Sequence, residues 1–358
     1  MGRMCPATTA PVPADESPSR DLGAPDFDVL PLSLGSAGDA VTDLQLRLVR
    51  LGLTTGDDAT AVFGNGTQRA ISGFQRQRGL RPDGICGKET WAAVVEAGYS
   101  LSDRILYRRT PMMHGDDVAD LQRRLSSLGF DPGGVDGIFG DRTTDALEDF
   151  QRNMGLVPDG ICGPRTINDL KRLAVRSGGD DLVSTVRERL LAASRPATLI
   201  GRRVAVGEQG GFATGVAAVC RALSALGAIP IPLHHPDESE LALSANRAAA
   251  DCYVGLRLEP GRAGLRTMYY RGFRYESETS KLLASLMRDA IAKQLELDDA
   301  STEGMALPVL RQTQMPAVLI ELGAPNIVAM RVVEVAQAIV SSLEQWLMVD
   351  WEANSSTT

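Results

Sequence analysis

Hydrophobic residues in the first half of the chain recur at three- and four-residue steps, which is the spacing of an amphipathic helix. Val41, Leu44 and Leu48 form one such stripe, and Gly52 follows it as a helix-ending glycine. A second helix is expected next, and a third that begins near Lys88, after a Pro-Asp-Gly turn. The pattern therefore predicts three short helices around one small core.

The same pattern occurs twice in the sequence. Residues 41–48 align with residues 118–125, and residues 82–87 align with residues 158–163. An internal repeat of this fidelity predicts two units of the same fold, with parallel roles. Both units resemble the type-1 peptidoglycan-binding domain, and this resemblance implies a shallow groove that holds a stem peptide or glycan fragment. The repeated residues are core and turn positions, so on their own they predict the fold and leave binding open.

The second half of the chain alternates short apolar strands with helices, which is an α/β pattern. We therefore predict a multidomain protein, with two small all-α three-helix repeats followed by an α/β domain. Strands are expected at 203–206, 228–233, 251–256, 265–270 and 315–322, and helices at 183–193, 212–226, 241–250, 277–295 and 329–348. The predicted divisions are a disordered arm 1–30, repeats 31–100 and 108–176, a linker with a helix 177–197, the α/β domain 198–348 and a flexible tail 349–358.

Composition narrows the classes of function. The 358 residues carry a net charge of −8, which argues against a general affinity for nucleic acid or anionic membranes. No apolar run approaches the ~20 residues that span a bilayer, and the first residues lack the apolar segment of a signal peptide. The five cysteines are odd in number and widely spaced, as expected of reduced thiols. These features predict a cytoplasmic protein.

One carboxylate, Glu321, stands at the end of the last expected strand. Pro316 precedes the apolar run of this strand, and Gly323 and Pro325 end it. A charge at this place is either solvated, paired with an arginine, or functional. The stretch 315–326 resembles the zinc-dependent N-acetylmuramoyl-L-alanine amidases of the amidase-3 type. That resemblance implies that Glu321 stands at the position of a catalytic glutamate, in an enzyme that cuts the amide between muramic acid and the stem peptide.

The resemblance also implies a zinc ion held by His, Glu and His, with water at an open position. Gln209 stands where the first His is expected, and Arg257 where the second is expected. The segment that should carry the ligand Glu is shortened and holds no clear counterpart, and Glu208 is the only carboxylate expected nearby. A guanidinium has no free lone pair, so Arg257 is not a metal ligand, and it is expected to pair with Glu321 or Glu208 instead. We therefore predict no metal and no cofactor, with zinc only if the protein is active.

Two functions follow from these features. The first is a catalytically inactive amidase homologue that regulates or scaffolds peptidoglycan precursor synthesis. Paired repeats followed by such a domain resemble an actinobacterial group of this kind, which implies peptidoglycan fragments or precursors, a MurA-like synthesis enzyme and a Ser/Thr kinase as partners. Thr357 and Thr358 are the candidate phosphoacceptors, with Thr8 and Thr9 next. The alternative is an active peptidoglycan amidase that binds the cell wall through its repeats. Neither function predicts nucleic-acid binding or membrane insertion.

Overall fold

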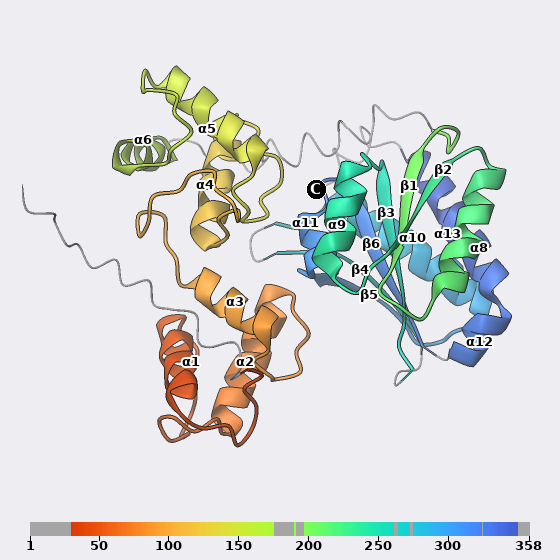
Figure 1. Ribbon diagram of the computed structural model, residues 1–358, viewed down its shortest axis with the longest axis horizontal. Coiled ribbons are helices and arrows are strands. Elements are labelled where there is room, and N and C mark those ends of the chain that lie inside the picture. The colour runs from red at the N-terminus through yellow and green to blue at the C-terminus, as the bar shows by residue number, and fades with distance from the viewer. Residues whose placement is uncertain are drawn as a thin grey trace, which may run out of the picture.

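The computed structural model of the chain describes residues 30–174, 190, 197–260, 264–272, 275–323 and 325–349. Figure 1 shows two small helical units beside a larger domain in which helices cover a twisted sheet. The fold class expected from the sequence is confirmed. The N-terminal arm, the C-terminal tail and the helix expected at 183–193, apart from Leu190, lie outside the described residues.

The first unit consists of α1 (Asp39–Arg50), α2 (Asn65–Arg78) and α3 (Lys88–Ala97). Its core contains the stripe that the sequence predicts, together with aromatic residues from the later helices. Gly52 has a φ of 78°, in the left-handed region that favours glycine after a helix. The first unit is therefore a three-helix repeat with its own core.

The second unit repeats this arrangement with α4 (Asp116–Ser127), α5 (Asp141–Asn153) and α6 (Pro164–Ala174). A separate core holds its helices together. Buried glutamines close the turns in both units. The Gln122 side chain accepts a hydrogen bond from Gly137 N at 2.8 Å and donates to Thr143 Oγ1 at 3.1 Å. Such bonds satisfy polar groups that burial would otherwise leave without partners.

The third unit contains a six-stranded sheet in the order β2-β1-β3-β6-β4-β5. All neighbouring strands are parallel except β4 and β6, which are antiparallel. The strands are β1 (Arg203–Glu208), β2 (Ile229–His234), β3 (Cys252–Leu258), β4 (Leu265–Tyr270), β5 (Ala300–Met305) and β6 (Ala317–Leu322). The central position of β6 explains its continuous apolar run, because a central strand is buried on both faces.

Helices cover both faces of this sheet, and α9 and α11 lie on the side of the repeats (Figure 1). The other face packs against α8, α10 and α13 in the larger core. The helices are α8 (Ala213–Ala225), α9 (Glu238–Arg247), α10 (Glu278–Leu295), α11 (Pro308–Gln312), α12 (Pro325–Met330) and α13 (Val332–Leu347). None of the helices in the described residues combines the length and apolar character needed to cross a bilayer.

Three details of the expected α/β domain need correction. The helix expected at 329–348 is two helices, because Arg331 leaves the helical conformation with φ −118° and ψ 28°. Pro325, which was expected only to end the strand, is the first residue of α12, where its missing N–H costs nothing. Strand β5 and the short helix α11 were not expected at all.

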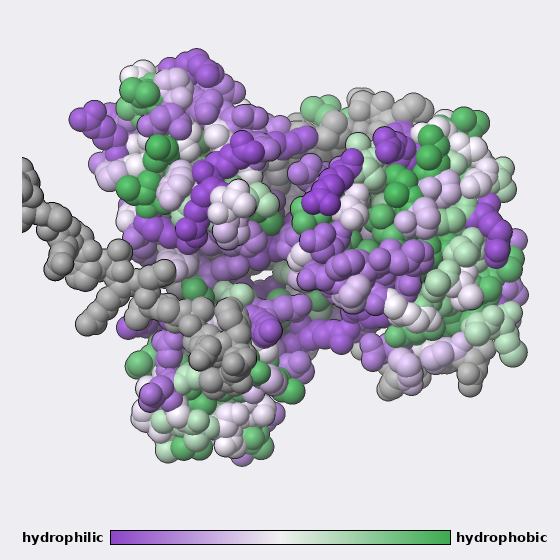
Figure 2. All heavy atoms as spheres, viewed as in Figure 1, coloured by the Kyte–Doolittle hydropathy of each residue, from purple (hydrophilic) through white to green (hydrophobic). Residues whose placement is uncertain are grey.

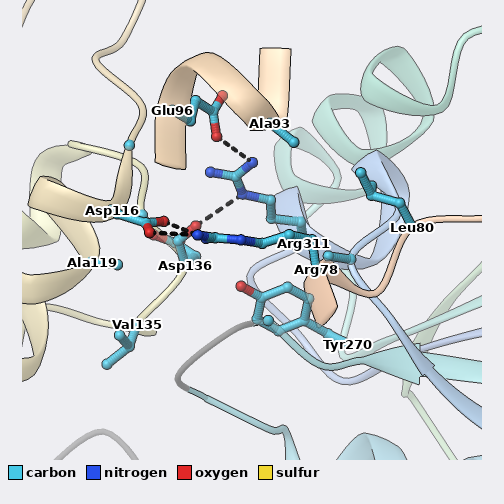
Figure 3. A pocket seen from close by; sticks show the side chains of 14 residues that line it. Arg78, Leu80, Ala93, Glu96, Asp116, Ala119, Val135, Asp136, Tyr270 and Arg311 are labelled. Carbon is cyan, nitrogen blue, oxygen red and sulfur yellow. Dashed lines mark hydrogen bonds and ion pairs between the residues drawn. The ribbon is translucent and has the colours of Figure 1, made fainter. Parts of the chain in front are cut away.

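The three units meet at a junction of charged side chains. Arg311 on α11 donates from Nε to the carbonyl of Asp136 at 2.9 Å and from Nη1 to Glu96 at 3.1 Å, so it contacts both repeats. Two hydrogen bonds, of 2.6 and 2.8 Å, join Arg78 of the first repeat to Asp116 of the second. Figure 3 shows these side chains converging above Tyr270. Figure 2 shows hydrophilic residues along the same boundary.

Candidate functional site

The register of the sheet places Glu321 between two arginines. Arg257 on β3 and Arg266 on β4 are both direct Cα partners of Glu321 on β6. Directly paired residues point to the same face of a sheet, so the three side chains form one row across the central strands. The face is the one covered by α9 and α11. The Glu321 side chain is 1% exposed.

A third guanidinium reaches this row from the first repeat. Arg81, in the Pro-Asp-Gly turn between α2 and α3, donates to Glu321 Oε1 at 2.7 Å. Arg257 donates to the same oxygen at 3.0 Å. Arg266 donates to Oε2 from Nε at 3.0 Å and also from Nη2. The carboxylate therefore accepts four hydrogen bonds, which is about the capacity of its lone pairs.

These contacts fix the ionisation of Glu321. Burial alone would raise the pKa of this carboxyl group, but the hydrogen bonds and charge of Arg266, with the charges of Arg81 and Arg257, lower the pKa below its ordinary value. The Arg266 pKa rises because its bonds and charge interaction with Glu321 outweigh the effect of burial. Glu321 is thus a saturated carboxylate, ionised at neutral pH.

The two residues at the expected zinc-ligand positions, Gln209 and Arg257, also lie together, and a third residue, Glu238, joins them. Arg257 Nη2 donates to Gln209 Oε1 and to Glu238 Oε1. The Gln209 amide donates to Glu238 Oε1 at 3.2 Å. Glu238 is the first residue of α9, which begins four residues after the end of β2 at His234. The expectation that Glu208 is the only carboxylate nearby is therefore wrong, since Glu238 is the carboxylate that meets Gln209 and Arg257.

Glu208 lies on the opposite face of the sheet. It is the Cα partner of Leu256, one position before Arg257, so the two side chains point to opposite faces. Glu208 accepts hydrogen bonds from Gly210 N at 2.7 Å and Phe212 N at 3.1 Å, and lies 2.9 Å from His234 Nδ1. Burial would raise the pKa of Glu208, but these bonds lower it. Of the two pairings open to Arg257, the structure contains the one with Glu321 and excludes Glu208.

Each arginine of the cluster has a carboxylate partner. Arg81, Arg257 and Arg266 face the carboxylates of Glu321, Glu238 and Glu303. The last of these binds Arg266 at 3.2 Å. A cleft of about 380 Å³ lies beside the cluster, between the first repeat and the α/β domain. Its lining consists of Arg81, Glu89, Glu238, Arg257, Glu259 and Leu307.

Comparison with known proteins identifies both halves of the chain. A family model described as a putative peptidoglycan binding domain matches residues 37–94 and 114–170, which are the two helical repeats. The protein named N-acetylmuramoyl-L-alanine amidase CwlM of Mycobacterium tuberculosis is 33% identical over 82% of this chain and 81% of its own length. The chain belongs to the N-acetylmuramoyl-L-alanine amidase family. The family expected from the motifs is thereby confirmed.

Two further similar proteins cover less of the chain. A probable N-acetylmuramoyl-L-alanine amidase of Bacillus licheniformis is 33% identical over 38% of this chain and 43% of its own length. The crystal structure of the N-acetylmuramyl-L-alanine amidase Ami1 from Mycobacterium smegmatis covers 42% of this chain and 98% of Ami1, at 18% identity and a TM-score of 0.36.

The residues at this site do not fit the zinc ion that the amidase family implies. The guanidinium of Arg257 lies between Gln209 and Glu238. It carries a positive charge and offers no lone pair to a cation. His234 contacts Glu208 on the other face. In the described part of the chain, no group of three or more His, Cys, Asp or Glu side chains is placed to hold a metal ion.

Sequence reasoning missed Arg81, Arg266 and Glu238. Arg266 was within a predicted strand, but only the register pairs it with Glu321. Glu238 had a usable signal, because an acidic residue in the first turn after an edge strand is typical of a helix start. The phosphoacceptor candidates Thr357 and Thr358, and likewise Thr8 and Thr9, lie outside the described residues.

Proposed function

We propose that this chain is a catalytically inactive homologue of the peptidoglycan amidases, and that it acts as a regulator or scaffold of peptidoglycan precursor synthesis. The observation that carries the proposal is the saturation of Glu321 by Arg81, Arg257 and Arg266. A carboxylate that accepts four hydrogen bonds has no site left for the proton of an attacking water.

The chemistry of the neighbouring side chains supports the same conclusion. Amide hydrolysis in this family needs a metal that polarises the carbonyl and activates water, which lowers the barrier by several kcal/mol. Arg257 bridges Gln209, Glu238 and Glu321, and thereby occupies the space between the residues that would surround such a metal. The cleft beside the cluster is still present, so a chain that does not hydrolyse amides can still bind other molecules there.

The partners follow from the family rather than from the geometry. We propose that the repeats bind peptidoglycan fragments or precursors, since a peptidoglycan binding domain matches both of them. A MurA-like enzyme is the proposed protein partner in the cytoplasm. A Ser/Thr kinase that modifies Thr357 or Thr358 would add about −1.5 to −2 charges and change the choice of partner.

The names of the relatives favour a second function, an active N-acetylmuramoyl-L-alanine amidase. Zinc content and cleavage separate the two functions. We expect the purified chain to carry well under one zinc per molecule and to release no stem peptide from sacculi. Elemental analysis and mass spectrometry of the released fragments measure these quantities. Near-stoichiometric zinc with amide cleavage would overturn the proposal.

A matched variant makes that experiment sharper. Gln209→His with Arg257→His returns two imidazoles to the positions that the family resemblance assigns to zinc ligands, beside Glu238. We expect this double variant to bind more zinc than the natural chain. A natural chain that binds as much zinc as the double variant would contradict an arginine-filled site.

The regulatory role needs a separate test in cells. We expect affinity capture of the full chain from its own cells to recover a peptidoglycan-synthesis enzyme, and depletion of the chain to change the level of peptidoglycan precursors. Cell fractionation tests the cytoplasmic location. Unchanged precursor levels after depletion would exclude the regulatory role.

A further inference from the structure

The two repeats contain one nearly identical turn. Residues 79–87 read Gly-Leu-Arg-Pro-Asp-Gly-Ile-Cys-Gly, and residues 155–163 read Gly-Leu-Val-Pro-Asp-Gly-Ile-Cys-Gly. The single difference is Arg81 in the first copy against Val157 in the second. The turn itself has the same internal bonds in both copies, because Gln75 donates to Asp83 at 2.8 Å and Gln151 donates to Asp159 at 2.8 Å. An arginine is therefore not needed to build the turn.

The surroundings of the two turns differ sharply. In the first repeat, the Gly79 carbonyl accepts a hydrogen bond from Ala306 N of the α/β domain at 2.7 Å, and Arg81 binds Glu321 at 2.7 Å. In the second repeat, a Cβ added to Gly155 would meet nothing within 4 Å, and Val157 is 74% exposed. Within the described residues, the first turn makes these contacts with the α/β domain and the second turn does not, so the two copies differ in their surroundings although their fold is the same.

We propose that the turn at residues 79–87 is a plug over Glu321, built into the chain at the wall of the cleft. Arg81 places its cation on the carboxylate that an amidase would present to its substrate. Docking of the first repeat therefore controls access to Glu321, while Val157 of the matching turn in the second repeat is exposed. The chain has a closed state, described by these contacts, and an open state in which the first repeat leaves the cleft. The inference goes beyond the regulatory proposal, because it holds whatever partner the chain binds.

The charge pattern supports a contact that can open. Besides Glu321, Arg257 forms an ion pair with Glu238, and Arg266 forms one with Glu303 at 3.2 Å. Among the residues that the structure describes, Arg81 has one carboxylate partner besides Glu321, the longer contact of 4.0 Å to Glu259, and its side chain is 46% exposed. Arg81 can thus return to water, whereas Glu321 keeps two arginines when the plug leaves. A buried carboxylate left with no partner would oppose opening far more strongly.

The decisive variant is Arg81→Val in the full chain. It copies the residue of the second repeat, so the turn is already known to accept it. The control is Arg76→Ala, which removes the same charge from an exposed position on α2. Hydrogen–deuterium exchange followed by mass spectrometry reports on peptides covering residues 79–87, 155–163 and 303–311. We expect Arg81→Val to speed exchange in the first and third of these by about tenfold or more, as loss of a charge-assisted hydrogen bond implies.

The second turn and the control variant define the opposite outcome. Exchange at residues 155–163 should stay unchanged in both variants. Equal exchange at residues 303–311 in Arg81→Val, Arg76→Ala and the natural chain would overturn the plug. A rise spread evenly over all three units would overturn it too, because Arg81 would then stabilise the fold as a whole and not one contact.

Glu321→Gln tests the same contact from the other side. If the plug acts through Arg81 and Glu321, combining Arg81→Val with Glu321→Gln should raise exchange at residues 303–311 little beyond the larger single effect. Effects that simply multiply would show that the two residues act separately and would contradict the inference.

Discussion

At the scale of single residues, the chemistry of the site depends on how many arginines reach Glu321. Arg257 follows from the sequence, because the family resemblance assigns it to a ligand position. Arg266 requires the antiparallel register of β4 with β6, which no local pattern encodes. Arg81 is 240 residues from Glu321 along the chain and belongs to another unit. A sequence can therefore indicate that the carboxylate needs a cation, but not which cation supplies it.

The ion cluster should contribute measurably to stability. We expect Glu321→Gln to lower the free energy of unfolding of the α/β domain by about 3 kcal/mol, because Arg257 and Arg266 lose the buried carboxylate that they share and keep only their outer partners, Glu238 and Glu303. Urea unfolding followed by fluorescence measures the change. Glu240→Gln, at an exposed position on α9, is the matched control and should change the free energy by less than about 0.5 kcal/mol. A loss no larger than that of the control would contradict a stabilising cluster.

The ionisation of Glu321 makes the stability of the α/β domain depend on pH. The pKa of Glu321 is lower in the folded protein than its ordinary value, because Arg266, Arg81 and Arg257 outweigh burial. Its contribution is therefore fully present above about pH 4.3, the ordinary glutamate pKa, and is lost as pH falls through the lowered folded value. We expect the stability difference between the natural chain and Glu321→Gln to be constant from pH 7 to pH 5 and to shrink below pH 4. A difference that grows in acid would show that the pKa is raised.

At the scale of elements, the helices and strands that the sequence predicts are those with a strong hydrophobic period. β4 and β6 are rich in apolar residues, and all the residues of β6 are buried. β5 has no such run, because it is an edge strand with four half-buried positions at its start. Helix α11 has only five residues, too few for a helical period to show. Weak burial and short length explain both omissions.

The glycine at the start of each turn offers a test between matched elements. Gly79 and Gly155 have φ angles of 68° and 69°, so alanine is equally strained at both. A Cβ on Gly79 would lie 2.8 Å from Ala306 N and from the Arg271 carbonyl, whereas one on Gly155 would meet nothing within 4 Å. The difference between the two alanine variants therefore isolates the contact between the first repeat and the α/β domain.

We expect Gly155→Ala to cost about 1 kcal/mol of repeat stability, the usual cost of a left-handed alanine. Gly79→Ala should cost the same and also increase hydrogen exchange at residues 303–311, since the first repeat must move away to make room. Thermal unfolding and exchange mass spectrometry measure the two effects. Equal exchange at residues 303–311 in both variants would show that the first repeat does not depend on this close approach.

At the scale of the whole molecule, the sequence predicted the three units but not their arrangement. The repeat and the change from helical to α/β patterning separate the units, because both are local signals. The junction depends on single side chains from distant parts of the chain. Arg311 on α11 contacts Glu96 of the first repeat and the Asp136 carbonyl of the second, and Figure 3 shows it between them. These contacts have no period along the sequence and so cannot be read from it.

Arg311→Ala should therefore separate the repeats from the α/β domain. The repeats should move as one body, because Arg78 and Asp116 still hold them together through two hydrogen bonds of 2.6 and 2.8 Å. Small-angle X-ray scattering of the full chain should show a larger radius of gyration than in the natural protein. Arg221→Ala, at an exposed position on α8 across the sheet from the repeats, is the matched control and should leave the radius unchanged. Adding Asp116→Ala to Arg311→Ala should increase the radius again, since the repeats then lose their mutual contact as well. An unchanged radius of gyration in Arg311→Ala would contradict this prediction. The contact of Arg81 with Glu321 would then be enough to hold the three units together.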